Sequence, residues 1–144
     1  MAVFKDERQL FECIGEFIKK VSLNEAVGPT IKCCGLVIKY QFSNPDCEIT
    51  IDAKNLCQEE AYFNVYYGES ELQPDVIMAM EADIAHRYWV GALDLITALT
   101  RRQIIARGPV HKIMRLLPSL KPAHAMYKQH LQEIKFEELD QQMA

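Results

Sequence analysis

The sequence contains no long apolar run. Its 144 residues are 49% hydrophobic and 25% charged, as in ordinary globular proteins. No segment approaches the roughly 18 consecutive apolar residues that a membrane-spanning helix needs. The first eight residues include four charged ones, and the sequence ends in Gln-Gln-Met-Ala. We therefore expect no secretory signal and no peroxisomal or ER-retention tail, and we predict one cytoplasmic globular domain over residues 1–144.

Motifs for metal binding, cofactor binding and nucleophilic catalysis are also missing. The odd number of cysteines and the lack of a Cys-x-x-Cys pair argue against a zinc site and a disulfide scaffold, so we expect reduced thiols. The histidines are not spaced like the ligands of a metal ion, and the glycines do not form a phosphate-binding loop. No cysteine has an evident neighbouring base that could activate it as a nucleophile. The cysteines and histidines considered are Cys13, Cys33, Cys34, Cys47, Cys57, His86, His111, His124 and His130. The sequence thus predicts no metal, no cofactor and no enzymatic activity.

Charge is unevenly distributed along the chain. The formal net charge is −4, yet residues 95–132 hold seven basic residues and no acidic one. This asymmetry predicts a basic surface, while a solvated helix face explains it equally well. The candidates for contact with an anionic headgroup, or transiently with an anionic membrane surface, are Arg101, Arg102, Arg107 and Arg115. Nucleic acid is not an expected partner, because these residues are not interleaved with exposed aromatic side chains.

The first half of the chain combines a helical pattern with alternating strands. Apolar residues recur every three or four positions over 4–21, which predicts an amphipathic helix within residues 1–22. Residues 22–30 read as a loop. Alternation over 36–42 and 47–51 around a turn at 43–46 predicts a hairpin, and 61–68 alternates as a third strand.

The stretch 73–118 is the most apolar part of the sequence. It predicts a strand over 74–80, helices over 82–91 and 92–100, a short strand over 103–107 and a helix over 110–117. Pro122 then opens a last helix, so the fold class is α+β. Several short elements converge here, and methionine adapts to irregular gaps, which favours the lining of an apolar cavity. A filled core is the simpler alternative.

The order of these elements resembles the sterol carrier protein type-two family over residues 31–120. The resemblance rests on the hairpin 35–52 with its Pro-Asp turn, Gln73-Pro74-Asp75-Val76, Glu81-Ala82-Asp83, and Ile104-Ile105-Ala106-Arg107-Gly108 before an apolar helix. Where the family often has a glycine and a lysine, this chain has Arg102 and Ile105. The resemblance implies a mixed five-stranded sheet covered by helices, with an apolar tunnel between them.

The same resemblance implies the function and its residues. Family members bind fatty acids, fatty acyl-CoA, sterols or phospholipids without chemistry. By position, the lining corresponds to Met78, Met80, Ile84, Tyr88, Leu93, Ile96, Leu99, Ile104 and Ala106, closed by Ile113, Met114 and Leu117. We therefore predict a carrier of a long-chain lipid (fatty acid, fatty acyl-CoA, sterol-like or isoprenoid) with its binding core at 31–120 and a C-terminal helix and polar tail at 121–144. The alternative is an adaptor that docks onto an enzyme of hydrophobic-substrate metabolism. A homodimer is left open.

Overall fold

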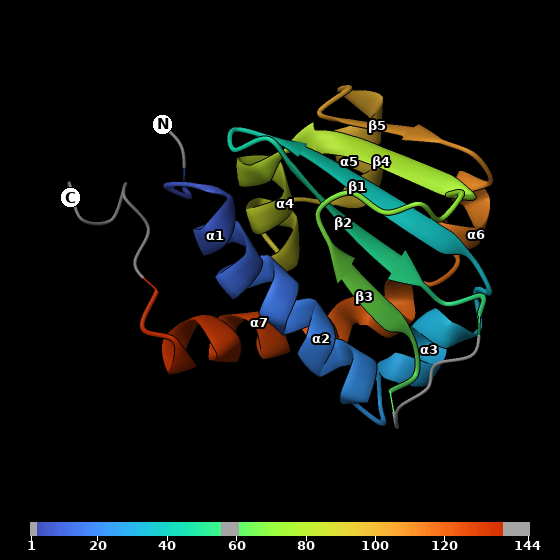
Figure 1. Cartoon of the computed structure of the whole chain (residues 1–144), viewed down its shortest axis with the longest axis horizontal. Coiled ribbons are helices and arrows are strands. Elements are labelled where there is room, and N and C mark those ends of the chain that lie inside the picture. The colour runs from blue at the N-terminus through green and yellow to red at the C-terminus, as the bar shows by residue number, and fades with distance from the viewer. Residues whose placement is uncertain (1–2, 56–60, 137–144) are drawn as a thin grey trace.

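A computed structural model describes residues 3–55 and 61–136 of the chain (Figure 1). Cys57 and the polar tail 137–144 lie outside the described residues. The elements in chain order are α1 (Glu7–Leu10), a π-helical turn (Phe11–Gly15), α2 (Glu16–Leu23), α3 (Gly28–Lys32), β1 (Val37–Ser43), β2 (Cys47–Asp52), β3 (Asn64–Tyr67), β4 (Val76–Glu81), α4 (Ala82–Trp89), α5 (Leu95–Thr100), β5 (Ile104–Arg107), α6 (Val110–Met114), a 3₁₀ turn (Leu117–Leu120) and α7 (Lys121–Glu133). Within the described ranges, no helix has the length and apolar character to cross a membrane.

The five strands form one mixed sheet in the order β3-β2-β1-β4-β5. β1 pairs antiparallel with β2 and parallel with β4, while β3 and β5 pair antiparallel at the two edges. Asp75 aligns the two central strands. Its carboxylate accepts a hydrogen bond from the Val37 N–H at 2.9 Å, and its own N–H donates to the Val37 carbonyl at 2.8 Å. The α+β class, the mixed five-stranded sheet and the hairpin predicted from the sequence are confirmed.

One face of the sheet is apolar across its whole width. Because residues paired across strands point to the same side, the register groups this face into three rows. They are Val65-Ile51-Ile38-Val76, Tyr67-Ile49-Tyr40-Met78-Ala106 and Cys47-Phe42-Met80-Ile104. The opposite face carries the Lys39–Glu48 ion pair at 3.8 Å and the exposed Ile105. The apolar face must therefore be covered by the helices.

The covering helices lie together on one side of the sheet (Figure 1). α2 packs on β3, α4 packs on β4, and α7 contacts both α2 and α4. His130 of α7 lies 2.8 Å from the Glu12 carbonyl through its Nε2 atom, and Lys20 of α2 pairs with Glu133 at 2.6 Å. These contacts join the last helix of the chain to the first.

The boundaries of several elements differ from the sequence prediction. The helix expected over 4–21 runs from Glu7 to Leu23 and includes a π turn, in which the Gly15 backbone packs closely on Tyr67. The loop expected at 22–30 contains the start of α3, with Pro29 in its first turn. β3 is shorter than the expected 61–68. The helix expected over 110–117 splits into α6 and the 3₁₀ turn, since Pro118 cannot donate a backbone hydrogen bond.

Gly108 ends β5 in a conformation that only glycine adopts readily. Its φ angle is +102°, and a Cβ atom there would lie 2.1 Å from the Asp75 carbonyl oxygen. The glycine therefore lets the backbone just after β5 lie against Asp75, which precedes the neighbouring strand β4, and Pro109 and α6 follow at once.

Candidate functional site

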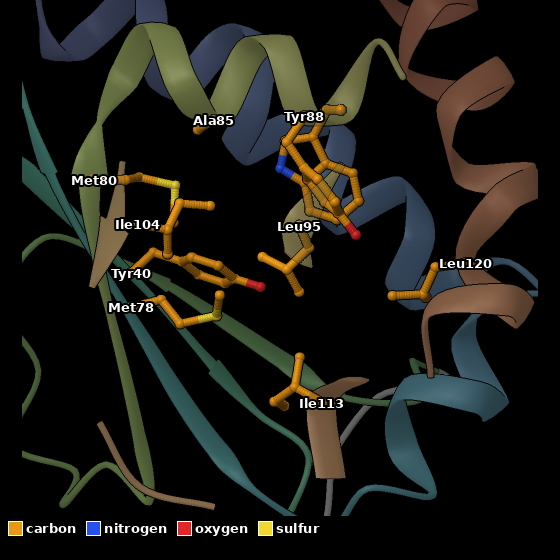
Figure 2. Close-up of a pocket in the computed structure, with 10 residues that line it drawn as sticks. Tyr40, Met78, Met80, Ala85, Tyr88, Leu95, Ile104, Ile113 and Leu120 are labelled. Atoms are coloured by element: carbon orange, nitrogen blue, oxygen red, sulfur yellow. The ribbon is translucent and has the colours of Figure 1, made fainter. Parts of the chain in front are cut away.

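An apolar cavity lies between the sheet and the short helices of the second half of the chain (Figure 2). It encloses about 40 Å³ and is lined by Tyr40, Met78, Met80, Ala85, Tyr88, Trp89, Leu95, Ile104, Ile113 and Leu120. The sheet supplies its floor, α4 and α5 supply one side, and α6 and the 3₁₀ turn supply the other. A site of roughly 10–15 Å³ already holds one water molecule, so this cavity has room for a few.

A second apolar cavity continues along the same face of the sheet toward α2 and α3. It encloses about 30 Å³, and its lining comprises Ile18, Val21, Ile31, Ile38, Tyr40, Ile51, Trp89, Ile113, Leu116 and Leu120. Four residues line both cavities: Tyr40, Trp89, Ile113 and Leu120. The two cavities are therefore neighbours with a common wall of side chains.

Among the described residues, two small cavities lie where the resemblance places a tunnel, and no continuous tunnel joins them. Binding sites for small molecules commonly measure roughly 300–1,000 Å³, far above the 40 and 30 Å³ found here. The common wall consists of side chains from four different elements. Ile113 belongs to α6, which has only five residues, and Leu120 belongs to the 3₁₀ turn, which has only four. Short helices have few internal hydrogen bonds, so this part of the wall is the least constrained.

Hydrogen bonds at helix ends hold α4 and α5 against the cavity. The Asp94 side chain caps α5 by accepting from the Thr97 N–H at 3.0 Å. Trp89 ends α4, and its carbonyl oxygen lies 3.0 Å from Nδ1 of His124 on α7. The His124 ring also contacts the Tyr88 ring edge-to-face at 5.7 Å. α7 therefore supports the two aromatic residues of α4 that border the cavity.

Two tyrosine hydroxyls enter this otherwise apolar space. In Figure 2 the side chains of Tyr40 and Tyr88 point their oxygen atoms toward the middle of the group of lining residues. Burial raises the pKa of Tyr40 above its ordinary range, and the neighbouring Tyr88 adds to this effect. Burial likewise raises the pKa of Tyr88 to about 12. Both side chains are therefore neutral hydrogen-bond donors at physiological pH.

No cluster of three or more candidate metal-ligating side chains occurs among residues 3–55 and 61–136. The described cysteines Cys13, Cys33, Cys34 and Cys47 are free. Burial raises the pKa of the Cys13 thiol to about 12, and it does the same for Cys47. Because the thiolate is the reactive form, these two thiols are poor nucleophiles.

No protein-family model and no curated protein matches the chain, but solved structures do. Apo sterol carrier protein 2 from Yarrowia lipolytica superposes with a TM-score of 0.59 at 17% identity, over 86% of this chain and 98% of that one. Sterol carrier protein domain 2 of Helicoverpa armigera gives 0.59 at 16% identity, over 78% and 88%. This chain has the sterol carrier protein 2 fold. The fold-level resemblance stated from the sequence is confirmed.

Two further structures show the same fold in other settings. A ubiquinone synthesis protein, UbiJ-SCP2, superposes with a TM-score of 0.56 at 11% identity, over 78% of this chain and 87% of that one. A double mutant of a sec-alkyl sulfatase gives 0.55 at 15% identity, over 72% of this chain. The match spans only 16% of the sulfatase, so that likeness concerns one part of a larger protein. The sterol carrier protein 2 fold therefore occurs both alone and within an enzyme.

On this fold, the predicted lining residues separate into three groups. Five of them line the first cavity: Met78, Met80, Tyr88, Ile104 and Ile113. Ile113 also lines the second cavity. Six others are buried or half-buried but line neither cavity: Ile84, Leu93, Leu99, Ala106, Met114 and Leu117. Ile96 is 51% exposed, because it occupies the solvent side of α5 while Leu95 and Ala98 face inward. The expectation that Ile96 faces the interior therefore does not match its position.

The four predicted headgroup residues, Arg101, Arg102, Arg107 and Arg115, are all exposed. None lines either cavity. Arg101 and Arg102 follow α5, Arg107 is the last residue of β5, and Arg115 follows α6. Their role in contacting a headgroup or a surface stays a prediction.

The sequence reasoning missed half of the lining of the first cavity. The missing residues are Tyr40, Ala85, Trp89, Leu95 and Leu120. A signal for Tyr40 was present, since it alternates with Lys39 and Gln41 and shares a face with Ile38 and Phe42. Leu120 had no such signal, because its position depends on a 3₁₀ turn that carries no periodic pattern.

Proposed function

We propose that this protein binds one long-chain lipid between its sheet and its helices and carries it without chemical conversion. The observation that supports this proposal is the pair of apolar cavities with a common wall on one face of the sheet. Outward displacement of Ile113 and Leu120 joins the two spaces into one elongated site. The ligand classes are those of a fatty acid, a fatty acyl-CoA, a sterol-like lipid or an isoprenoid.

Burial of the ligand supplies the energy for this opening. Apolar surface removed from water contributes about 25 cal/mol per Å². A lipid that buries about 300 Å² of chain would thus gain roughly 7 kcal/mol before the costs of binding and of moving the wall. The described part of the lining consists of aliphatic, methionine and aromatic side chains and offers no charged group to such a chain.

The names of the structural neighbours agree with this proposal. Two are named as sterol carrier proteins and one as a ubiquinone synthesis protein. For this chain we infer that a charged headgroup, where the ligand has one, stays outside the cavity near the exposed Arg101, Arg102, Arg107 and Arg115. The same residues would meet an anionic membrane surface during transfer.

Native mass spectrometry of the protein purified from cells tests the proposal. We expect a co-purified lipid, or a one-to-one complex after addition of palmitate, palmitoyl-CoA or cholesterol. A ligand-free mass that none of these three lipids changes would contradict it.

A matched pair of variants locates the site. Ala85 lines the first cavity, whereas Ala125 is exposed on α7. Ala85→Leu is expected to abolish lipid uptake or weaken it by at least tenfold, because the new side chain occupies the cavity. Ala125→Leu makes the same chemical change outside it and should bind as the wild type does. Equal uptake by both variants would place the lipid elsewhere.

A further inference from the structure

The two hydroxyls in the first cavity have orientations fixed by ring packing. The Tyr40 ring stacks on Phe42 with centroids 6.0 Å apart and an interplanar angle of 4°. The Tyr88 ring meets Trp89 edge-to-face at 4.9 Å and His124 at 5.7 Å. Both oxygen atoms project from these packed rings into the cavity (Figure 2). The hydroxyls are therefore held in place before any ligand arrives.

Within the described part of the chain, no hydrogen bond from either hydroxyl to another protein group is found; the bonds formed by tyrosine hydroxyls there involve Tyr67 and Tyr127. Both residues are half-buried, and neither hydroxyl is among the buried side-chain atoms that lack a partner, so both are accessible to water in the free protein. A lipid that fills the cavity displaces this water, and a hydroxyl then left without a partner costs about 1–3 kcal/mol. Two hydroxyls directed into one apolar cavity therefore point to a ligand atom that accepts hydrogen bonds.

The surroundings of the hydroxyls limit the charge of that atom. Among the residues that the structure describes, no lysine, arginine or histidine lines either cavity, and the four exposed arginines lie outside both. An ionised carboxylate or phosphate moved into this space would lose its hydration without gaining a cation, which is strongly unfavourable. An uncharged carbonyl or hydroxyl oxygen requires only the two O–H donors.

Resting on the proposed function, we propose that Tyr40 and Tyr88 form a hydrogen-bond site for an uncharged oxygen acceptor of the bound lipid. The protein is then selective for neutral oxygenated lipids, such as esters, ketones and alcohols, over ionised fatty acids. The acceptor enters the cavity together with the apolar chain, and the two phenols fix its depth.

Ligands of equal chain length test this selectivity. Binding of methyl palmitate, palmitate and hexadecane is measured by displacement of a fluorescent apolar probe at pH 8. We expect methyl palmitate to bind most tightly. Palmitate should bind more tightly as the pH falls and its carboxyl group becomes neutral, while methyl palmitate should show no such dependence.

Removal of the hydroxyls provides the second arm. Tyr40→Phe and Tyr88→Phe should each weaken the binding of methyl palmitate about two- to tenfold, as expected for the loss of one net hydrogen bond. The affinity for hexadecane should stay unchanged. Tyr66→Phe, at an exposed position on the opposite face of the sheet, is the control and should change neither ligand.

The outcomes separate this inference from the proposed function. Unchanged methyl palmitate affinity in both phenylalanine variants, or tighter binding of palmitate than of methyl palmitate at pH 8, overturns the inference while lipid binding itself stands. An equal loss for hexadecane would show a packing effect and also overturns it. If the wild type binds none of the three ligands, the proposed function fails and the inference fails with it.

Discussion

The helical layer packs on the sheet in two different ways. Where α2 meets α4 and α7, the space is filled: Phe17 of α2 is fully buried and makes edge-to-face contacts with Trp89 at 5.1 Å and with Tyr127 at 5.0 Å. Where α6 and the 3₁₀ turn cover the sheet, two cavities remain, and the second also borders Ile18 and Val21 of α2. We call these the filled half and the hollow half of the layer.

Element length accounts for the difference. α2 and α7 have 8 and 13 residues, against five for α6 and four for the 3₁₀ turn. A longer helix presents several turns of one apolar stripe, and its side chains interdigitate over that whole length. Short elements meet at changing angles and leave gaps that their side chains do not reach. From this comparison we expect one half to contribute most of the stability of the fold, and we propose that the other half admits the ligand.

The largest effect is expected from truncation in the filled half. Phe17→Ala should lower the free energy of unfolding by about 3–5 kcal/mol, because the ring contacts of a fully buried side chain are lost and a cavity forms. Ile113→Ala in the hollow half should cost only about 2 kcal/mol, since Ile113 already borders both cavities. Urea denaturation measures both values. Equal costs would show that the two halves contribute alike.

Enlarging one alanine in each half gives a smaller but sharper contrast. Ala123 is 1% exposed on α7 and Ala85 is 2% exposed on α4, and both are helical. Ala123→Leu should destabilise the protein by about 1–3 kcal/mol through overpacking. Ala85→Leu, whose side chain enters a cavity, should change stability by less than about 1 kcal/mol. If thermal unfolding instead ranks Ala85→Leu as the more damaging change, the hollow half is better packed than its cavities suggest.

The sequence predicted the sheet better than the layer above it. The alternation around Tyr40 and Ile49 gave the hairpin, and the change of period after Met80 gave α4. These signals are local, since a strand or helix shows its buried face in its own residues. The π turn at Phe11–Gly15 and the short α3 had no comparable signal, because each depends on contacts with distant residues such as Tyr67 and Tyr62.

The candidate site was predictable only in part, for the same reason. Met78, Met80 and Ile104 lie on the apolar rows of the sheet, so strand alternation and the resemblance both lead to them. Ile96 shows the limit of a helical pattern: α5 has only six residues, and the pattern did not distinguish its covered side from its exposed side. Whether two apolar faces meet or leave a cavity is decided by packing across the whole layer, which no local pattern records.

Asp52, the last residue of β2, lies outside both halves, so a change there should affect stability without affecting lipid binding. Burial opposes ionisation of Asp52, but hydrogen bonds from the Asn55 backbone and side chain and from the Lys54 N–H outweigh it, and the pKa of Asp52 lies below its ordinary value. A carboxyl group with a lowered pKa in the folded state stabilises the protein above its unfolded-state pKa, and this contribution is lost as the pH falls through the folded-state value.

We therefore expect Asp52→Asn to cost about 1–2 kcal/mol at pH 7 and progressively less as the pH falls below about 4. Urea titrations of wild type and variant between pH 7 and pH 3 measure the difference. A cost that stays constant over this range would mean that the carboxylate charge contributes nothing. Since Asp52 lines neither cavity, lipid binding at pH 7 should be unchanged in the variant.

The smallest expected signal reports on the boundary between the two halves. Trp89 is the single tryptophan of the chain, borders both cavities and touches Phe17 of the filled half. Entry of a lipid into the hollow half should change the intensity and wavelength of its emission modestly, because the indole gains ligand contacts while its contact with Phe17 is kept. Ala85→Leu, with its cavity occupied, should show no such change on addition of the same lipid. Mass spectrometry can show when the wild-type protein is fully loaded with lipid. If its emission is still unchanged at that point, the ligand lies away from the common wall. The distinction between a stabilising half and a binding half would then be wrong.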